Sequence, residues 1–158
     1  MRSRILLQHA DSICEVLRLT KAEDMRKPEN LKIVQLWCRQ KIKDKVPGMI
    51  WCSIPCVGGS ARNDMNPARH TRKFKSRLRM HIREYLGLWR NFENIAREMA
   101  AEGWSIAIEW PASCRYWRRK GVAKLKRYMD LHTAQCRGCA MGLVDDANLP
   151  IAKPWHIS

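Results

Sequence analysis

Two residues with reactive side chains close short apolar runs in this sequence. Cys56 closes the run 49–56, and the chain then turns through Gly58-Gly59-Ser60. Glu109 closes a second run, 104–109. A thiolate is a nucleophile and a carboxyl group can hold or give a proton, so together they could add to a substrate and stabilise the charge that develops. The two residues form a candidate catalytic pair, with a buried structural thiol as the alternative for Cys56.

The elements that must position this pair alternate between strand and helix. Each apolar run is short and is bounded by Pro or Gly, which is typical of a buried strand. Helical spacing follows up to about residue 101 and again from 113 or 114 to 131, and a third strand is predicted over 133–136. Long crossovers between strands predict a parallel sheet with right-handed connections. Its strands would end at one edge, where ligands gather.

The predicted fold class is therefore α/β, a Rossmann-like open, mostly parallel sheet with flanking helices. Two N-terminal helices are expected before it, the first within 4–27 and the second beginning at Glu29-Asn30 and ending before Pro47-Gly48. With 158 residues the chain is long enough for one domain. We divide it into an N-terminal helical segment (1–47), a core (48–144) and an irregular C-terminal tail (145–158).

Positive charge dominates the composition. The chain has 30 Lys and Arg against 15 Asp and Glu, a formal net charge of +15. Such a surface attracts polyanions, and nucleic acid is the expected partner. The basic residues concentrate between 62 and 83 and on one helix face between 115 and 127. The residues expected to contact nucleic acid are Ser60, Arg62, Arg69, Arg72, Lys73, Lys75, Arg77, Arg79, Arg115, Arg118, Arg119 and Lys120.

Membrane insertion is not expected from this sequence. No apolar segment approaches the ~20 residues that a spanning helix requires, and we find no lipidation motif. The apolar run after Met1-Arg2-Ser3-Arg4 ends too early for a signal peptide. We expect an intracellular protein, cytoplasmic or nuclear.

The chain has seven cysteines, an odd number, and several of them lie in apolar runs. Both features favour reduced thiols over disulfides. Three residues separate Cys52 from Cys56 and two separate Cys136 from Cys139, so four thiolates could form a structural zinc site. The alternative is that these are small buried core residues. The histidines show no metal-like spacing, and we assign no metal site.

With Cys56 and Glu109 placed, the layout resembles the catalytic half of DNA cytosine C5-methyltransferases over about residues 45–143. In that family one strand ends in Pro-Cys before a loop with a small or hydroxyl residue, as in Pro55-Cys56 and Ser60, and the next ends in a Glu, as at Glu109. The resemblance implies that Cys56 attacks C6 of a flipped-out cytosine while Glu109 hydrogen-bonds the N3 edge.

The chain departs from that family in several features. Trp110-Pro111 follows the Glu in place of Asn-Val, and neither a Phe-x-Gly-x-Gly turn nor a Gln-Arg-x-Arg motif is present. The resemblance implies S-adenosylmethionine as cofactor, but its binding motif is not found, so the cofactor stays unknown. The chain resembles a shortened or degenerate copy of the domain. Similar Ile-Pro-Cys, Glu-Trp-Pro and Gly-Cys motifs occur in reading frames associated with mobile elements.

Three hypotheses follow from these observations. The first is a basic nucleic-acid-binding protein with a degenerate methyltransferase-like fold, with Trp110, Tyr116 or Trp117 available to stack on unpaired bases. The second is a cytosine C5-methyltransferase-like enzyme that uses the candidate catalytic pair. The third is an interaction module in which Trp89 or Trp155 docks a partner chain that completes the missing cofactor half.

Overall fold

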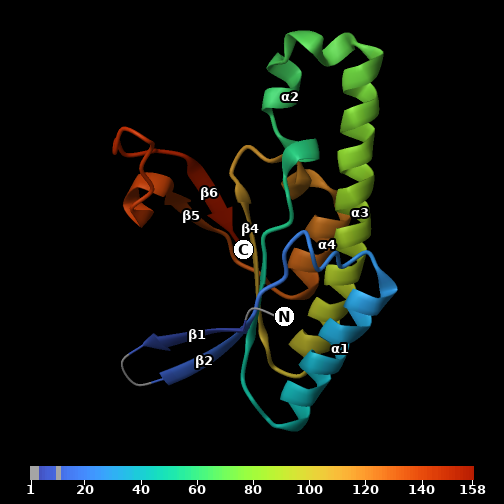
Figure 1. The fold of residues 1–158 in the computed structure, drawn as a ribbon, viewed down its shortest axis with the longest axis vertical. Helices are drawn as coiled ribbons and strands as arrows, with labels where there is room; N and C mark the ends of the chain where they lie inside the picture. The colour runs from blue at the N-terminus through green and yellow to red at the C-terminus, as the bar shows by residue number, and fades with distance from the viewer. Residues whose placement is uncertain (1–3, 10–11) are drawn as a thin grey trace.

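The structure, a computed structural model, describes residues 4–9 and 12–158. In these residues helices and strands form a mixed α/β fold (Figure 1). The helices are α1 (Pro28–Lys43), α2 (Arg62–Met65), α3 (Arg72–Ala101) and α4 (Lys120–Tyr128). The strands are β1 (Arg4–His9), β2 (Ser12–Leu17), β3 (Met49–Cys52), β4 (Ser105–Pro111), β5 (Ala134–Arg137) and β6 (Pro154–Ile157).

The main sheet has the strand order β3-β4-β6-β5 and is mostly antiparallel. Only β3 and β4 pair in parallel, with Met49 opposite Ser105, whereas β6 runs antiparallel to both β4 and β5. The predicted mostly parallel, Rossmann-like sheet is therefore wrong. β4 and β5 do run in the same direction, because two antiparallel steps restore it, but β6 lies between them.

The C-terminal tail supplies this intervening strand, so the prediction of an irregular tail is wrong for residues 154–157. The tail contains two prolines, Pro150 and Pro154, a residue type that is uncommon inside strands. However, Pro154 is the first residue of β6, a position at which a strand tolerates proline. The backbone of Ser158 then pairs with that of Ile108, which extends the ladder between β6 and β4.

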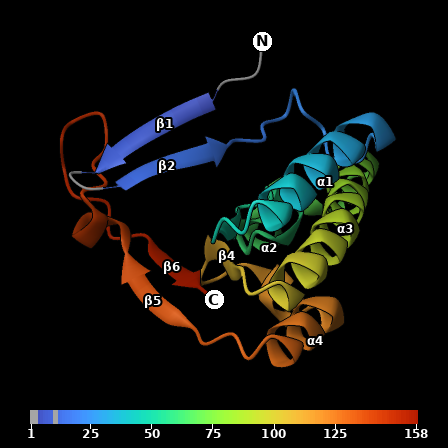
Figure 2. The same ribbon diagram turned by 90° about the horizontal axis from the view of Figure 1, so that it is seen from below.

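The N-terminal region also differs from the prediction. In place of the expected helix within 4–27, β1 and β2 form an antiparallel hairpin in which Arg4 pairs with Leu17 and His9 with Ser12. Short apolar runs fit helix and strand alike, and the β-branched residues in this stretch favour the strand. Figures 1 and 2 show the hairpin extending away from the long helix α3.

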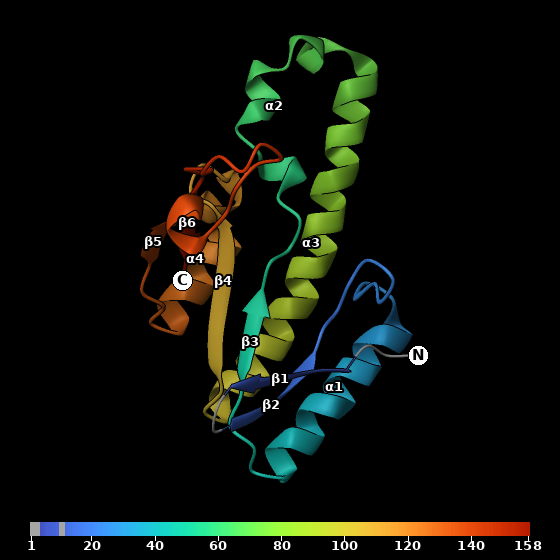
Figure 3. The ribbon, with the colours of Figure 1, turned by 60° about the vertical axis from the view of Figure 1, so that its left-hand side comes forward.

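Several other predicted elements are confirmed, whereas the helix predicted from 113 or 114 to 131 forms only in part, as the 3-10 turn Arg115–Arg118 and α4. α1 forms where the second N-terminal helix was expected, beginning at Pro28, a residue suited to the first turn. The strand before Cys56 is β3, the strand ending near Glu109 is β4, and α3 runs to Ala101 as expected. β3 and β4 lie side by side (Figure 3).

The helices cover one face of the main sheet (Figure 2), and the core lies between these layers. Its centre is a cluster of aromatic rings in which Tyr85 and Tyr116 stack with ring centroids 3.6 Å apart. Trp110 packs against both tyrosines, and its indole N–H donates to the Ile54 carbonyl oxygen at 2.7 Å. A second cluster joins α1 to the C-terminal half of α3 around Met99.

Burial divides α3 into two halves. Its buried side chains begin at Tyr85, and residues 72–84 include none. At 1.5 Å per residue this first part is about 20 Å long. With α2 beside it, it rises beyond the end of the sheet in Figures 1 and 3.

Candidate nucleic-acid interface and thiol site

The first part of α3 carries five of the twelve predicted nucleic-acid contacts. We name residues 72–83 the basic tip. The helix begins there because Thr71 caps it, its Oγ1 accepting from the Phe74 N–H at 3.2 Å. The six basic residues of the tip are all exposed, and in the described part of the chain none lies within ion-pair distance of a carboxylate. They are Arg72, Lys73, Lys75, Arg77, Arg79 and Arg83.

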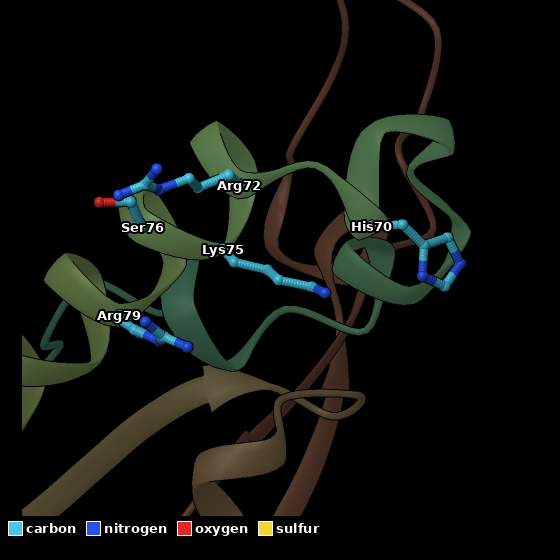
Figure 4. A pocket seen from close by; sticks show the side chains of 5 residues that line it. All are labelled: His70, Arg72, Lys75, Ser76 and Arg79. Carbon is cyan, nitrogen blue, oxygen red and sulfur yellow. The ribbon is translucent and has the colours of Figure 1, made fainter.

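A hollow of about 430 Å³ opens on one side of the basic tip. Figure 4 shows Lys75 and Arg79 extending from α3 at this hollow, with His70 on the neighbouring turn and Arg72 near Ser76. Cationic side chains around this hollow attract oxyanions such as phosphate groups.

An ion pair between Asp64 and Arg115 joins the two predicted basic segments. Asp64 lies in α2 and Arg115 in the 3-10 turn Arg115–Arg118, so segments far apart in the sequence become neighbours. Asp64 was the one acidic residue within the first basic segment, and this pair places its charge against a cation outside the tip.

The other predicted contact residues divide by exposure. Arg119 is partly buried, and its guanidinium lies 5.8 Å from the ring centroid of Tyr85 and 5.9 Å from that of Tyr116. Packing against the core therefore accounts for this cation without a nucleic-acid role. Ser60 is also partly buried, and its Oγ accepts from the Arg62 N–H at 3.3 Å. The exposed members outside the tip are Arg62, Arg69, Arg115, Arg118 and Lys120.

Two of the three predicted stacking aromatics are buried. Trp110 and Tyr116 are each only 1% exposed and belong to the core cluster. Trp117 is partly buried, and its indole N–H donates to the Pro111 carbonyl oxygen at 3.1 Å. Trp89, suggested as a docking residue, is buried as well. Burying a large aromatic ring in the core contributes more free energy than leaving it exposed to stack on a base, which explains these errors.

Cys56 lies just beyond β3, at the start of the 3-10 turn Val57–Gly59. The Gly59 N–H is not open to a ligand, because it donates to the Cys56 carbonyl oxygen at 2.9 Å. A Cβ atom on Gly59 would lie 2.8 Å from the Tyr116 ring, closer than side-chain atoms approach. Glycine is therefore required by close packing against Tyr116.

A second thiol, that of Cys114, controls the electrostatics of Cys56. Cys114 donates a hydrogen bond to the Cys56 sulfur, and this bond together with the Lys153 charge lowers the pKa of Cys56 from 9.0 to about 6. The same hydrogen bond and burial raise the pKa of Cys114. One proton thus stays on the buried Cys114 sulfur, and the partly exposed Cys56 carries the thiolate near neutral pH.

Glu109 occupies the expected position on β4, the strand parallel to and beside β3. It is near enough to Cys56 for its charge to oppose the lowering of the Cys56 pKa. One carboxylate oxygen accepts from the indole N–H of Trp51 at 3.2 Å. Trp51 is 52% exposed, so the sheet face that carries it and Glu109 is open to solvent.

Neither the zinc site nor the cofactor site finds support in these residues. Within 4–9 and 12–158 no three His, Cys, Asp or Glu side chains gather as a metal would require, and Cys52, Cys56, Cys136 and Cys139 are free thiols. The chain before β3 carries no Phe-x-Gly-x-Gly turn, so no residues are assigned to S-adenosylmethionine. We therefore derive no step through that cofactor.

Two residues of the thiol site were missed in the sequence. Cys114 comes three residues after Pro111, the last residue of β4, and its place just beyond a strand end could have indicated it. Lys153 lies in the tail, beyond any local signal, and its ammonium group lies 4.3 Å from the ring centroid of Trp155.

Comparison of the chain with protein-family models, with curated proteins and with solved structures found no match. None of the helices in the described residues has the length and apolar composition needed to cross a membrane.

Proposed function

We propose that this protein binds nucleic acid through the basic tip of α3. The observation that carries the proposal is the set of six exposed cations that have no acidic partner in the described chain. Uncompensated cations on one short stretch repel one another, and the phosphates of a polyanion neutralise them. The release of the counterions condensed on the polyanion further favours binding.

Salt dependence tests the proposal directly. If six phosphates are neutralised, the logarithm of the association constant falls with the logarithm of salt concentration with a slope of about −5. We would titrate a fluorescently labelled oligonucleotide with the protein at several salt concentrations and follow anisotropy. Absence of binding even at low salt would contradict the proposal.

A matched pair of variants separates the basic tip from general positive charge. Replacing Lys75 and Arg79 by Gln removes two cations of the tip, and we expect the slope to lose about two units. Replacing Lys32 and Lys43 by Gln removes two exposed cations from α1 and should leave the slope unchanged. Equal effects of the two variants would show that net charge, and not the tip, drives binding.

The thiol site supports a second candidate function, covalent addition to a pyrimidine base. The low pKa of Cys56 and the position of Glu109 at the end of the adjacent parallel strand favour it. The Cys56 thiolate would form a bond to C6 of cytosine while Glu109 hydrogen-bonds N3, and C5 would take up a solvent proton. Loss of the original C5 proton with expulsion of the thiolate would restore the base.

This reaction needs no cofactor and leaves a measurable trace, exchange of the cytosine C5 hydrogen with solvent. We would incubate a cytosine-containing single strand with the protein in deuterated water and measure its mass. Exchange that disappears in Cys56→Ser would support the reaction, whereas an oligonucleotide that gains no deuterium would exclude it.

A further inference from the structure

The arrangement of charges around the basic tip indicates which nucleic acid it fits. At 100° per residue, its six cations cover an arc of about 200° that runs from Lys75 to Arg77. The partly buried residues of the tip, Phe74, Leu78, His81 and Ile82, occupy the rest of the circumference. Cations therefore stand on both flanks of the exposed arc, with Ser76 at its centre.

A flat contact with one phosphate strand would use a single stripe of cations. Cations on opposite flanks can both reach phosphates only when the helix lies between two backbones, that is, in a groove. The hollow beside Lys75 and Arg79 opens on one flank, and a second hollow lined by Lys73, Arg77 and Met80 opens on the other.

Groove dimensions select among nucleic acids. A helix with its side chains is about 10–12 Å wide, and the major groove of B-form DNA is about 12 Å wide. The minor groove, about 6 Å wide, is too narrow, and the deep major groove of A-form RNA does not admit side chains. The ~20 Å of α3 before its first buried residue is long enough to enter such a groove while the sheet stays outside.

We propose that the ligand is double-stranded DNA and that the basic tip of α3 enters its major groove, an inference that rests on the proposed nucleic-acid binding. Lys75 and Arg77 contact phosphates on opposite strands. Ser76 and Arg72 face the base edges, where hydroxyl and guanidinium groups can read hydrogen-bonding patterns. Arg62 and Arg69, on the segment beside the tip, contact one of the two backbones.

The first test compares three ligands of equal length at one salt concentration: a DNA duplex, an RNA duplex of the same sequence, and the DNA single strand. We expect the DNA duplex to bind at least about 10-fold more tightly than the other two. Methyl green, which occupies the major groove, should displace the protein, and distamycin, which occupies the minor groove, should not.

The second test examines the two flanks separately. Lys75→Gln and Arg77→Gln should each reduce the salt slope on duplex DNA by about one unit, and the double variant by about two. Lys32→Gln is the control, and circular dichroism checks that α3 remains folded. Loss in one flank only, or equal affinity for the RNA duplex or the single strand, would overturn groove insertion but leave nucleic-acid binding intact. No binding to any of the three ligands would overturn both proposals.

Discussion

The hydrogen bond from Cys114 to Cys56 predicts an unusual pH profile for the reactivity of Cys56. Replacing Cys114 by Ala removes the donor that contributes most to the low Cys56 pKa. In the unaltered protein Cys56 titrates near pH 6, so reaction with iodoacetamide should reach its plateau by about pH 7. In Cys114→Ala we expect the midpoint to rise toward the ordinary thiol value of 9.0, because burial raises the Cys56 pKa and the Lys153 charge, a smaller effect, lowers it.

The ratio of rates at two pH values gives the magnitude. A thiol with a pKa of about 6 is ~90% ionised at pH 7, so its rate should rise by only about 1.1-fold between pH 7 and pH 9. A thiol with a pKa of about 9 is ~1% ionised at pH 7, and its rate should rise about 50-fold. The absolute rate at pH 7 distinguishes the two pKa values less well. The thiol with the lower pKa has ~90-fold more thiolate, but that thiolate has ~20-fold lower intrinsic nucleophilicity.

The assay contains its own control. Trypsin would release Cys52 and Cys56 in one peptide, 46–62, and mass spectrometry can assign the label to either residue. Burial raises the pKa of Cys52 to about 12, so Cys52 should stay unlabelled in the folded protein. A Cys56 midpoint near pH 9 in the unaltered protein, or one that does not move in Cys114→Ala, would refute the reasoning.

Three further predictions concern stability. Trp110→Ala should lower the free energy of unfolding by about 3–5 kcal/mol, because it leaves a cavity in the core and removes the hydrogen bond to Ile54. Trp51→Ala, at an exposed position, should lower it by less than about 1 kcal/mol. Urea denaturation measures both, and equal effects would contradict the assignment of Trp110 to the core. Gly59→Ala should cost about 1–3 kcal/mol through its clash with the Tyr116 ring, and an unchanged urea midpoint would exclude that packing. Between about pH 6 and pH 9 the unfolded chain keeps the protons of both Cys56 and Cys114, whereas the folded thiol pair has released one. The free energy of unfolding should therefore rise with pH more steeply than that of Cys114→Ala. Parallel pH profiles of the two proteins would count against the thiol pair.

The sequence by itself determined the elements that local signals define. Spacing of apolar residues predicted α1 and α3, and Pro and Gly bounded β3 and β4 where they occur. It also placed Cys56 and Glu109 at the ends of adjacent parallel strands, because long helical crossovers favour that pairing. The concentration of cations at the start of α3 is likewise a property of the sequence alone.

Only the tertiary structure decided what these elements pair with and which side chains they bury. The insertion of β6 between β4 and β5, the hydrogen bond between Cys114 and Cys56, and the ion pair between Asp64 and Arg115 join residues distant in the chain. The same holds for Trp110 and Tyr116, whose rings complete a core built from four elements instead of a surface for bases. Periodicity reports which face of a segment is apolar, but the partner of that face depends on the rest of the chain.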